Sequence, residues 1–289
     1  MSLHAEKNGL TLGFSPCPND TFIFHSLVHG GQRGDGSPAF AEPVLVDVET
    51  LNEWAIAGRL DVTKLSFHAL GHVLDRYILL MSGSALGRGC GPLLVAKKNI
   101  SPGELFPLTI AIPGVYTTAA MLLRMYSPVP LQTKVMRFDK IMPAIVAGEV
   151  DAGVIIHESR FTFQEHGLLL LQDLGAWWEQ VTGFPIPLGG IAAKRSLGKE
   201  KIQAIDRCIR ASVASAFIFP EAGMDYIRQH SQELDDKVIM DHIGLYVNPF
   251  SVDLGEVGIG AVREFLERGR LLGAFSRVFS GLPLTSEEL

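Results

Sequence analysis

The sequence predicts an α/β protein of two similar lobes with a ligand-binding cleft between them. Short apolar segments alternate with amphipathic ones along most of the chain, which is typical of strands and helices around a mostly parallel sheet. Three short phrases occur twice in the same order: residues 10–14 and 108–112, residues 57–61 and 147–151, and residues 94–98 and 191–195. One α/β unit built twice places its polar strand ends on either side of a single cleft.

The composition indicates a globular protein and excludes several classes of partner. The 289 residues are 47% hydrophobic and 19% charged, which suffices for a sizeable core. The net charge of -6 is spread without long runs, so we expect neither nucleic acid nor an anionic membrane as a partner. Residues 1–9 are polar, and no apolar run approaches the ~20 residues of a membrane helix. We therefore expect a soluble, cytoplasmic protein without membrane insertion.

The first copy begins with a strand over residues 10–14 that stops at Ser15. Asn19 or Asp20 is expected to cap the helix that follows. The next predicted elements are a strand over 43–48, a helix over 49–58, a strand over 62–67, a turn over 87–92 and a strand over 93–97.

The second copy repeats this order and is followed by helices. Its predicted elements are a strand over 108–112, a helix from Thr117 or Thr118, a strand over 132–137, a helix capped by Asp139 and ending at Gly148, a strand over 150–156, a loop around 177–178 and a strand over 190–194. From residue 197 onward the chain is expected to form four helical segments that return to the first lobe. This is the layout of a type II periplasmic-binding-protein fold, with a first lobe of residues 1–97 and 193–289 and a second lobe of residues 98–192.

Polar residues gather at the two strand-to-helix junctions. Ser15 and Asn19 lie at the first junction, and Thr117 and Thr118 lie at the equivalent place in the second copy. Backbone N–H groups at a helix start, aided by hydroxyls, can bind a carboxylate or a phosphate. Turn formation and helix capping explain the same residue types, so both interpretations stay open.

Lys64 and Ser66 follow the first repeated phrase, in a strand that also holds Leu65. A lysine in an apolar strand needs a partner, because burying an unpaired ammonium is costly. Lys64 either reaches the surface or meets an anion in the cleft, and we favour the anion.

His157 ends the buried strand that follows the second repeated phrase. A neutral imidazole there can accept a proton near neutral pH, which makes His157 the candidate general base. The sequence His157-Glu158 is not a zinc motif, because Phe161 stands where the second histidine is required. Glu158 and Arg160 either orient the ring or form a surface ion pair.

Three further features receive no catalytic role. Cys17 lies between two prolines and has no histidine partner that the sequence reveals, so it is not assigned as a nucleophile. Trp177 and Trp178 either wall an aromatic ligand or pack in the core. The three cysteines form no C-x-x-C pair, so neither a disulfide framework nor a zinc site is expected.

Six motifs over about residues 10–255 resemble the 1,4-dihydroxy-6-naphthoate synthase family of the futalosine pathway of menaquinone biosynthesis. They are residues 13–22, 47–52, 63–66, 85–89, 155–162 and 173–178. The resemblance implies a carbon–carbon lyase that acts on cyclic dehypoxanthine futalosine without a metal or organic cofactor. It also implies that His157 is the general base and that a small-molecule aromatic carboxylate contacts Lys64, Leu65, Ser66, Thr117 and Thr118.

Two alternatives share the expected fold. One is chorismate dehydratase of the same pathway, and the other is a non-catalytic protein that binds small carboxylates. The motif at residues 155–159 and the opening at residues 15–20 favour the synthase.

Overall fold

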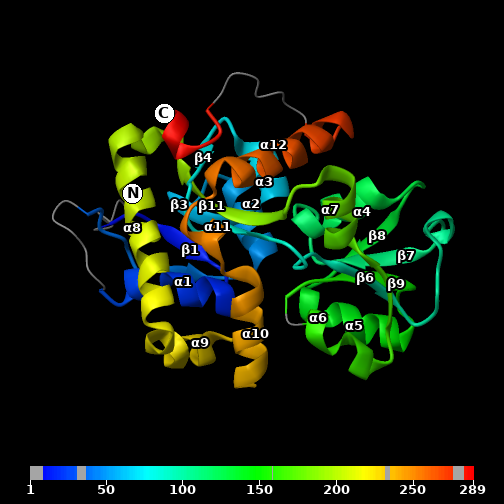
Figure 1. Ribbon diagram of the computed structural model, residues 1–289. Coiled ribbons are helices and arrows are strands. Elements are labelled where there is room, and N and C mark those ends of the chain that lie inside the picture. The colour runs from blue at the N-terminus through cyan, green and yellow to red at the C-terminus, as the bar shows by residue number, and fades with distance from the viewer. Residues whose placement is uncertain (1–8, 31–36, 158, 232–234, 276–282) are drawn as a thin grey trace, which may run out of the picture.

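Two β-sheets lie at opposite ends of the molecule, each with helices packed around it (Figure 1). The computed structural model describes residues 9–30, 37–157, 159–231, 235–275 and 283–289. The six-stranded sheet has the order β2 (Val44–Leu45), β1 (Leu12–Phe14), β3 (Val62–Ser66), β11 (Ile186–Lys194) and β4 (Tyr77–Leu79), with β5 (Ala85–Gly87) also paired to β11. The five-stranded sheet has the order β10 (Leu169–Asp173), β6 (Leu93–Ala96), β9 (Ala152–Ile155), β7 (Thr109–Ile112) and β8 (Gln132–Val135). We call the part around the six-stranded sheet the first lobe and the other the second lobe.

The two sheets contain the same four-stranded arrangement, which confirms the predicted two-lobed fold. In the first lobe β1 runs parallel to both β2 and β3, and β3 pairs with antiparallel β11. In the second lobe β7 runs parallel to both β8 and β9, and β9 pairs with antiparallel β6. Each antiparallel strand therefore belongs to the lobe built from the other half of the chain. The lobe boundaries after residues 97 and 192 stay a prediction, and a division by sheets would fall before β6 and before β11.

The repeated phrase at residues 57–61 and 147–151 ends in an aspartate that makes the same kind of hydrogen bond in both lobes. Asp61 ends its first occurrence, and one of its carboxylate oxygens accepts the backbone N–H of Thr11 at 3.0 Å. Asp151 ends the second occurrence and accepts the backbone N–H of Thr109 at 2.8 Å. Both aspartates thus tie the start of a central strand to the neighbouring strand, which explains why the phrase and the residues 10–14 and 108–112 recur together.

Twelve α-helices are formed by the described residues, and those that follow β11 lie with the first lobe (Figure 1). They are α1 (Pro18–Val28), α2 (Val48–Ile56), α3 (Phe67–Val73), α4 (Thr118–Tyr126), α5 (Phe138–Ala147), α6 (Ser159–Thr162), α7 (Leu174–Thr182), α8 (Lys199–Ile218), α9 (Met224–His230), α10 (Asp236–Tyr246), α11 (Pro249–Val252) and α12 (Gly255–Leu271). Short 3₁₀ helices occupy Pro102–Glu104, Phe163–His166, Arg195–Leu197, Pro220–Gly223 and Ser286–Glu288. None of the helices in the described part of the chain is both long and apolar enough to cross a membrane.

Two predicted helix caps are wrong. The N-cap of α1 is Cys17, with Pro18 in the first helical position, so Asn19 and Asp20 fall inside the first turn. The N-cap of α5 is Arg137, and Asp139 lies in the first turn and pairs with the Arg137 guanidinium at 2.5 Å. In both helices the chain enters the helical conformation one or more residues before the polar side chain that was expected to cap it.

The loop predicted around residues 177–178 is also wrong, because those residues belong to α7. Asp173 caps this helix by accepting the N–H groups of Gly175 at 2.9 Å and Ala176 at 3.0 Å. Trp178 is fully buried and donates its indole N–H to the Pro185 carbonyl at 3.1 Å. Core packing is therefore the role of Trp178.

Candidate active site

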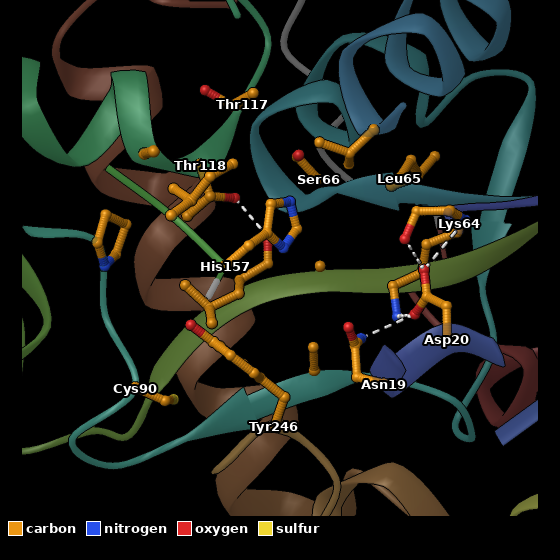
Figure 2. A pocket seen from close by; sticks show the side chains of 18 residues that line it. Asn19, Asp20, Lys64, Leu65, Ser66, Cys90, Thr117, Thr118, His157 and Tyr246 are labelled. Atoms are coloured by element: carbon orange, nitrogen blue, oxygen red, sulfur yellow. Dashed lines mark hydrogen bonds and ion pairs between the residues drawn. The ribbon is translucent and has the colours of Figure 1, made fainter. Parts of the chain in front are cut away.

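A pocket of about 680 Å³, partly open to solvent, lies where the carboxyl ends of strands from both sheets meet. Its walls come from the ends of β1, β3 and β9, the start of α4, and β11 and α10 (Figure 2). All eight residues predicted for the site line this pocket: Ser15, Asn19, Lys64, Leu65, Ser66, Thr117, Thr118 and His157. Their roles toward a ligand stay predictions.

Lys64 meets an anion, and that anion is a carboxylate of the protein. Its ammonium lies 2.7 Å from Asp20 Oδ1 and also donates to the Gly83 carbonyl at 3.2 Å. Lys64 is 5% exposed and Asp20 is 1% exposed, so this is a buried ion pair. From the sequence, Asp20 was expected only to cap the helix that follows the first strand. Because a lysine in an apolar strand needs a counterion, the sequence did indicate that Lys64 has an anionic partner, but it did not identify Asp20.

Further hydrogen bonds satisfy the Asp20 carboxylate. Ser15 donates both its hydroxyl, at 2.7 Å, and its backbone N–H, at 3.2 Å, to Asp20 Oδ2. Asn19 Nδ2 donates to Asp20 Oδ1 at 2.9 Å. The turn between β1 and α1 is thus organised around one buried carboxylate.

Ser66, the last residue of β3, is held by Asn52 of α2. The Ser66 backbone N–H donates to Asn52 Oδ1 at 2.8 Å, and Asn52 Nδ2 donates to Ser66 Oγ at 3.1 Å. Asn52 Nδ2 also donates to Glu49 Oε2 at 3.0 Å. Because Ser66 Oγ accepts in this arrangement, its own proton can be directed toward a ligand. The neighbouring Leu65 has a fully buried side chain.

Thr117 and Thr118 stand at the start of α4. Thr117 is the N-cap: its hydroxyl oxygen accepts the Ala120 N–H at 3.2 Å and its hydroxyl donates to the Gly114 carbonyl at 2.8 Å. The Thr118 hydroxyl donates to the Leu188 carbonyl at 2.6 Å. Both hydroxyl protons are therefore used within the protein. The first N–H groups of a helix have no intrahelical acceptor, so the backbone is the part of this turn best suited to an anion.

His157 follows β9 with a φ of 58°, and it is the one non-glycine residue with positive φ in the described part of the chain. Such backbone costs on the order of 1–3 kcal/mol and is concentrated at functional sites. The ring packs edge-on against Phe138, with centroids 4.9 Å apart, and lies nearly parallel to the His242 ring at 6.0 Å. In Figure 2 the His157 side chain lies between the threonines of α4 and the Lys64–Asp20 pair.

Cys17 has the histidine partner that the sequence did not reveal. Its Sγ lies 3.8 Å from His157 Nε2. These two residues are 140 positions apart, so only the meeting of the two lobes brings them together. A second thiol, Cys90, lines the pocket, and burial raises its pKa to about 12, which keeps it neutral.

His242 of α10 is a buried group next to the site that the sequence analysis missed. Its Nε2 lies 3.0 Å from Asn19 Oδ1. Because Asn19 must present its NH₂ group to Asp20, its oxygen faces His242, and this assigns the proton of His242 to Nε2. Burial, and next the nearby His157, hold the pKa of His242 well below its ordinary value. His242 is therefore a neutral hydrogen-bond donor that fixes the Asn19 amide.

Arg160 and Trp177 are not among the residues that line the pocket. Arg160 pairs with Asp173 at 3.0 Å and donates to the Gly91 carbonyl, so it holds the start of α7. Glu158, expected to orient the ring or pair at the surface, falls outside the described residues. Trp177 packs edge-on against Tyr126 with centroids 5.6 Å apart, and Tyr246 supplies the aromatic side chain of the pocket wall.

The two sheets and the pocket between them define a protein of the periplasmic-binding-protein fold. One solved structure with a similar fold is the periplasmic aliphatic sulphonate-binding protein of Escherichia coli. The TM-score is 0.64 at 12% identity, and the match covers 93% of this chain and 89% of that one. A solved structure of a protein from Archaeoglobus fulgidus is more similar, with a TM-score of 0.84 at 32% identity over 93% of this chain and 99% of the other.

Sequence comparison shows to which family the chain belongs. The menaquinone biosynthesis family model matches residues 10–270, and the chain belongs to that family. It is 53% identical to a 1,4-dihydroxy-6-naphthoate synthase of Thermus thermophilus, over 91% of this chain and 95% of the relative. The corresponding enzyme of Streptomyces coelicolor is 45% identical over 91% of this chain and 94% of its own length. The protein is thus an enzyme of menaquinone biosynthesis.

Proposed function

We propose that the protein is a carbon–carbon lyase that converts cyclic dehypoxanthine futalosine into 1,4-dihydroxy-6-naphthoate, with His157 as the general base. The observation that carries the proposal is the position of His157, which faces one pocket together with the start of α4 and Ser66. The names of the two relatives support the same product.

The carboxylate of the substrate is assigned to the start of α4. The backbone N–H groups of Thr118 and Ala119 occupy the first two helical positions, and the positive end of the helix dipole adds to them. The Ser66 hydroxyl donates from the opposite wall. Lys64 uses two of its three ammonium protons on Asp20 and Gly83, so the third can reach a substrate oxygen.

His157 then removes a proton from the bound substrate. The electron pair that this proton leaves on the substrate forms a new double bond as a carbon–carbon bond breaks, and the ring that remains becomes aromatic. The electrons of the broken bond stay with the departing fragment, which takes up the proton held by His157. Apolar side chains around the reacting atoms, such as Ile156 and Leu188, exclude water from this step. A positioned general base contributes about 10²–10⁴-fold to such a reaction.

Incubation of the purified protein with cyclic dehypoxanthine futalosine, followed by chromatography for the naphthoate, tests the proposal. We expect turnover, and we expect His157→Ala to lose at least about 10²-fold in kcat while it keeps its circular dichroism spectrum. The matched control is His166→Ala, which removes an exposed histidine from the short helix Phe163–His166.

Three outcomes would contradict the proposal. Ligand binding without product favours the non-catalytic carboxylate-binding protein. Dehydration of chorismate in place of lyase activity favours chorismate dehydratase. Turnover near that of the wild type in His157→Ala removes the assigned role of His157.

A further inference from the structure

Glu49 connects the two lobes beside the pocket. It lies in the first turn of α2 in the first lobe, and its carboxylate reaches the turn that joins β7 to α4 in the second lobe. The Tyr116 backbone N–H lies 2.9 Å from Glu49 Oε1 and 3.3 Å from Oε2. One carboxylate therefore holds the segment immediately before Thr117.

The same carboxylate is coupled to the opposite wall of the pocket. Glu49 Oε2 accepts Asn52 Nδ2 at 3.0 Å, and that amide nitrogen also donates to Ser66 Oγ at 3.1 Å. A continuous set of hydrogen bonds thus runs from Tyr116 through Glu49 and Asn52 to Ser66. One end is Ser66, and the other end, Tyr116, comes just before the start of α4. Both ends therefore adjoin the groups to which the substrate carboxylate is assigned.

Gly114 shows that the turn is shaped to fit this carboxylate. A Cβ added at Gly114 would lie 2.3 Å from Glu49 Cδ, 2.4 Å from Oε2 and 2.5 Å from Cγ. The φ of Gly114 lies outside the left-handed region, so its backbone would accept alanine. The absence of a side chain at this position is therefore explained by the close approach of Glu49.

The surroundings of Glu49 do not favour its charged form. Burial raises the pKa of Glu49, and the hydrogen bonds from Asn52 and from the backbone of the turn only partly oppose this shift. A carboxylate with a raised pKa disfavours the folded state whenever it is ionised. Groups that reduce stability while touching a ligand-binding turn are typical of functional positions.

We propose that Glu49 is a positioning residue that holds the turn before Thr117 against the first lobe and, through Asn52, sets the distance between that turn and Ser66. The proposal rests on the function proposed above, because it assigns the substrate carboxylate to those two groups. Glu49 acts through its neighbours and does not touch the substrate.

The test compares Glu49→Gln with Glu53→Gln, which removes the same charge from an exposed position of the same helix. Glutamine keeps one oxygen for the Tyr116 N–H and loses the charge and the second acceptor. We expect Glu49→Gln to raise KM on the order of tenfold and to change kcat less than about threefold. In the ligand-free protein the amides of residues 114–118 should exchange with deuterium faster, while the melting temperature at pH 8 stays equal or rises. The charge of Glu53 acts on Glu49 more weakly than burial and the hydrogen bonds do, so Glu53→Gln should change KM and this exchange much less than Glu49→Gln does.

A double-mutant cycle tests the contact itself. Gly114→Ala alone should raise KM as Glu49→Gln does, because its methyl group displaces the carboxylate. In a Glu49→Ala background the same change should add nothing, since the clash has been removed. Additive effects, or unchanged exchange in Glu49→Gln, would overturn the proposal.

These measurements test the role of Glu49 separately from the proposed lyase function. Deuterium exchange is measured without substrate, and calorimetric binding of 2-naphthoate probes the carboxylate site without turnover. A wild type that makes no naphthoate contradicts the proposed function. Equal exchange, or equal 2-naphthoate affinity, in wild type and Glu49→Gln contradicts the role of Glu49.

Discussion

Replacement of Lys64 by methionine tests whether the buried ion pair organises the turn between β1 and α1. The variant removes the ammonium and leaves the Asp20 carboxylate, which is 1% exposed, without its cation. Breaking a buried pair on one side costs about 3–5 kcal/mol. Asp20 keeps three other donors, two from Ser15 and one from Asn19, so we place the loss at the lower end, near 3 kcal/mol.

The assay is thermal and urea unfolding of the full chain. A loss of about 3 kcal/mol corresponds to a melting temperature lower by roughly 5 °C in a protein of 289 residues. The matched control is Lys194→Met, another strand lysine, which lies 3.2 Å from Asp61 with side chains 25% and 27% exposed. A pair this exposed contributes about 1 kcal/mol or less. Equal losses in the two variants would refute the reasoning, because burial would then not determine the effect.

Two further changes test other parts of the structure. Burial, and next the nearby His72, lower the pKa of His68 to about 4. The unfolded chain therefore binds this proton first, and stability should fall by roughly 3 kcal/mol as the pH drops from about 6.5 to 4. Urea titrations should show a flatter pH dependence in His68→Gln. Gly91→Ala would place Cβ 2.3 Å from Gly175 Cα, so calorimetry should show a loss of about 1–3 kcal/mol, whereas Gly103→Ala meets no atom within 4 Å and should not.

Local patterns predicted the framework of the fold. The repeated phrase predicted two equivalent units, and Asp61 and Asp151 make the same strand-to-strand hydrogen bond in each. Gly58 and Gly148 adopt φ values of 66° and 77° where the helices were expected to stop. These features depend on a few neighbouring residues, so periodicity and turn chemistry are sufficient to locate them.

The contacts that surround His157 depend on residues far apart in the sequence. Asn19 and His242 are 223 positions apart, and no local pattern relates them. The Cys17–His157 contact likewise requires both lobes to be assembled. Asp20 was assigned to a cap because acidic residues favour helix starts, but the buried ammonium of Lys64 determines its actual orientation. Tertiary pairing of buried charge therefore outweighed the local preference.

In this doubled fold α1 and α4 begin at equivalent places, and the start of α1 already holds a carboxylate of the protein itself. At α1 the first helical residue is Pro18, which has no N–H to offer, and Asp20 already places a negative charge in the first turn. Lys64 neutralises that charge, so the positive end of α1 is satisfied within the protein. The first turn of α4 contains no acidic residue, and Thr118 in its first position retains its N–H. Both helix starts line the pocket that holds His157, and of the two only α4 leaves its positive end available for the proposed substrate carboxylate.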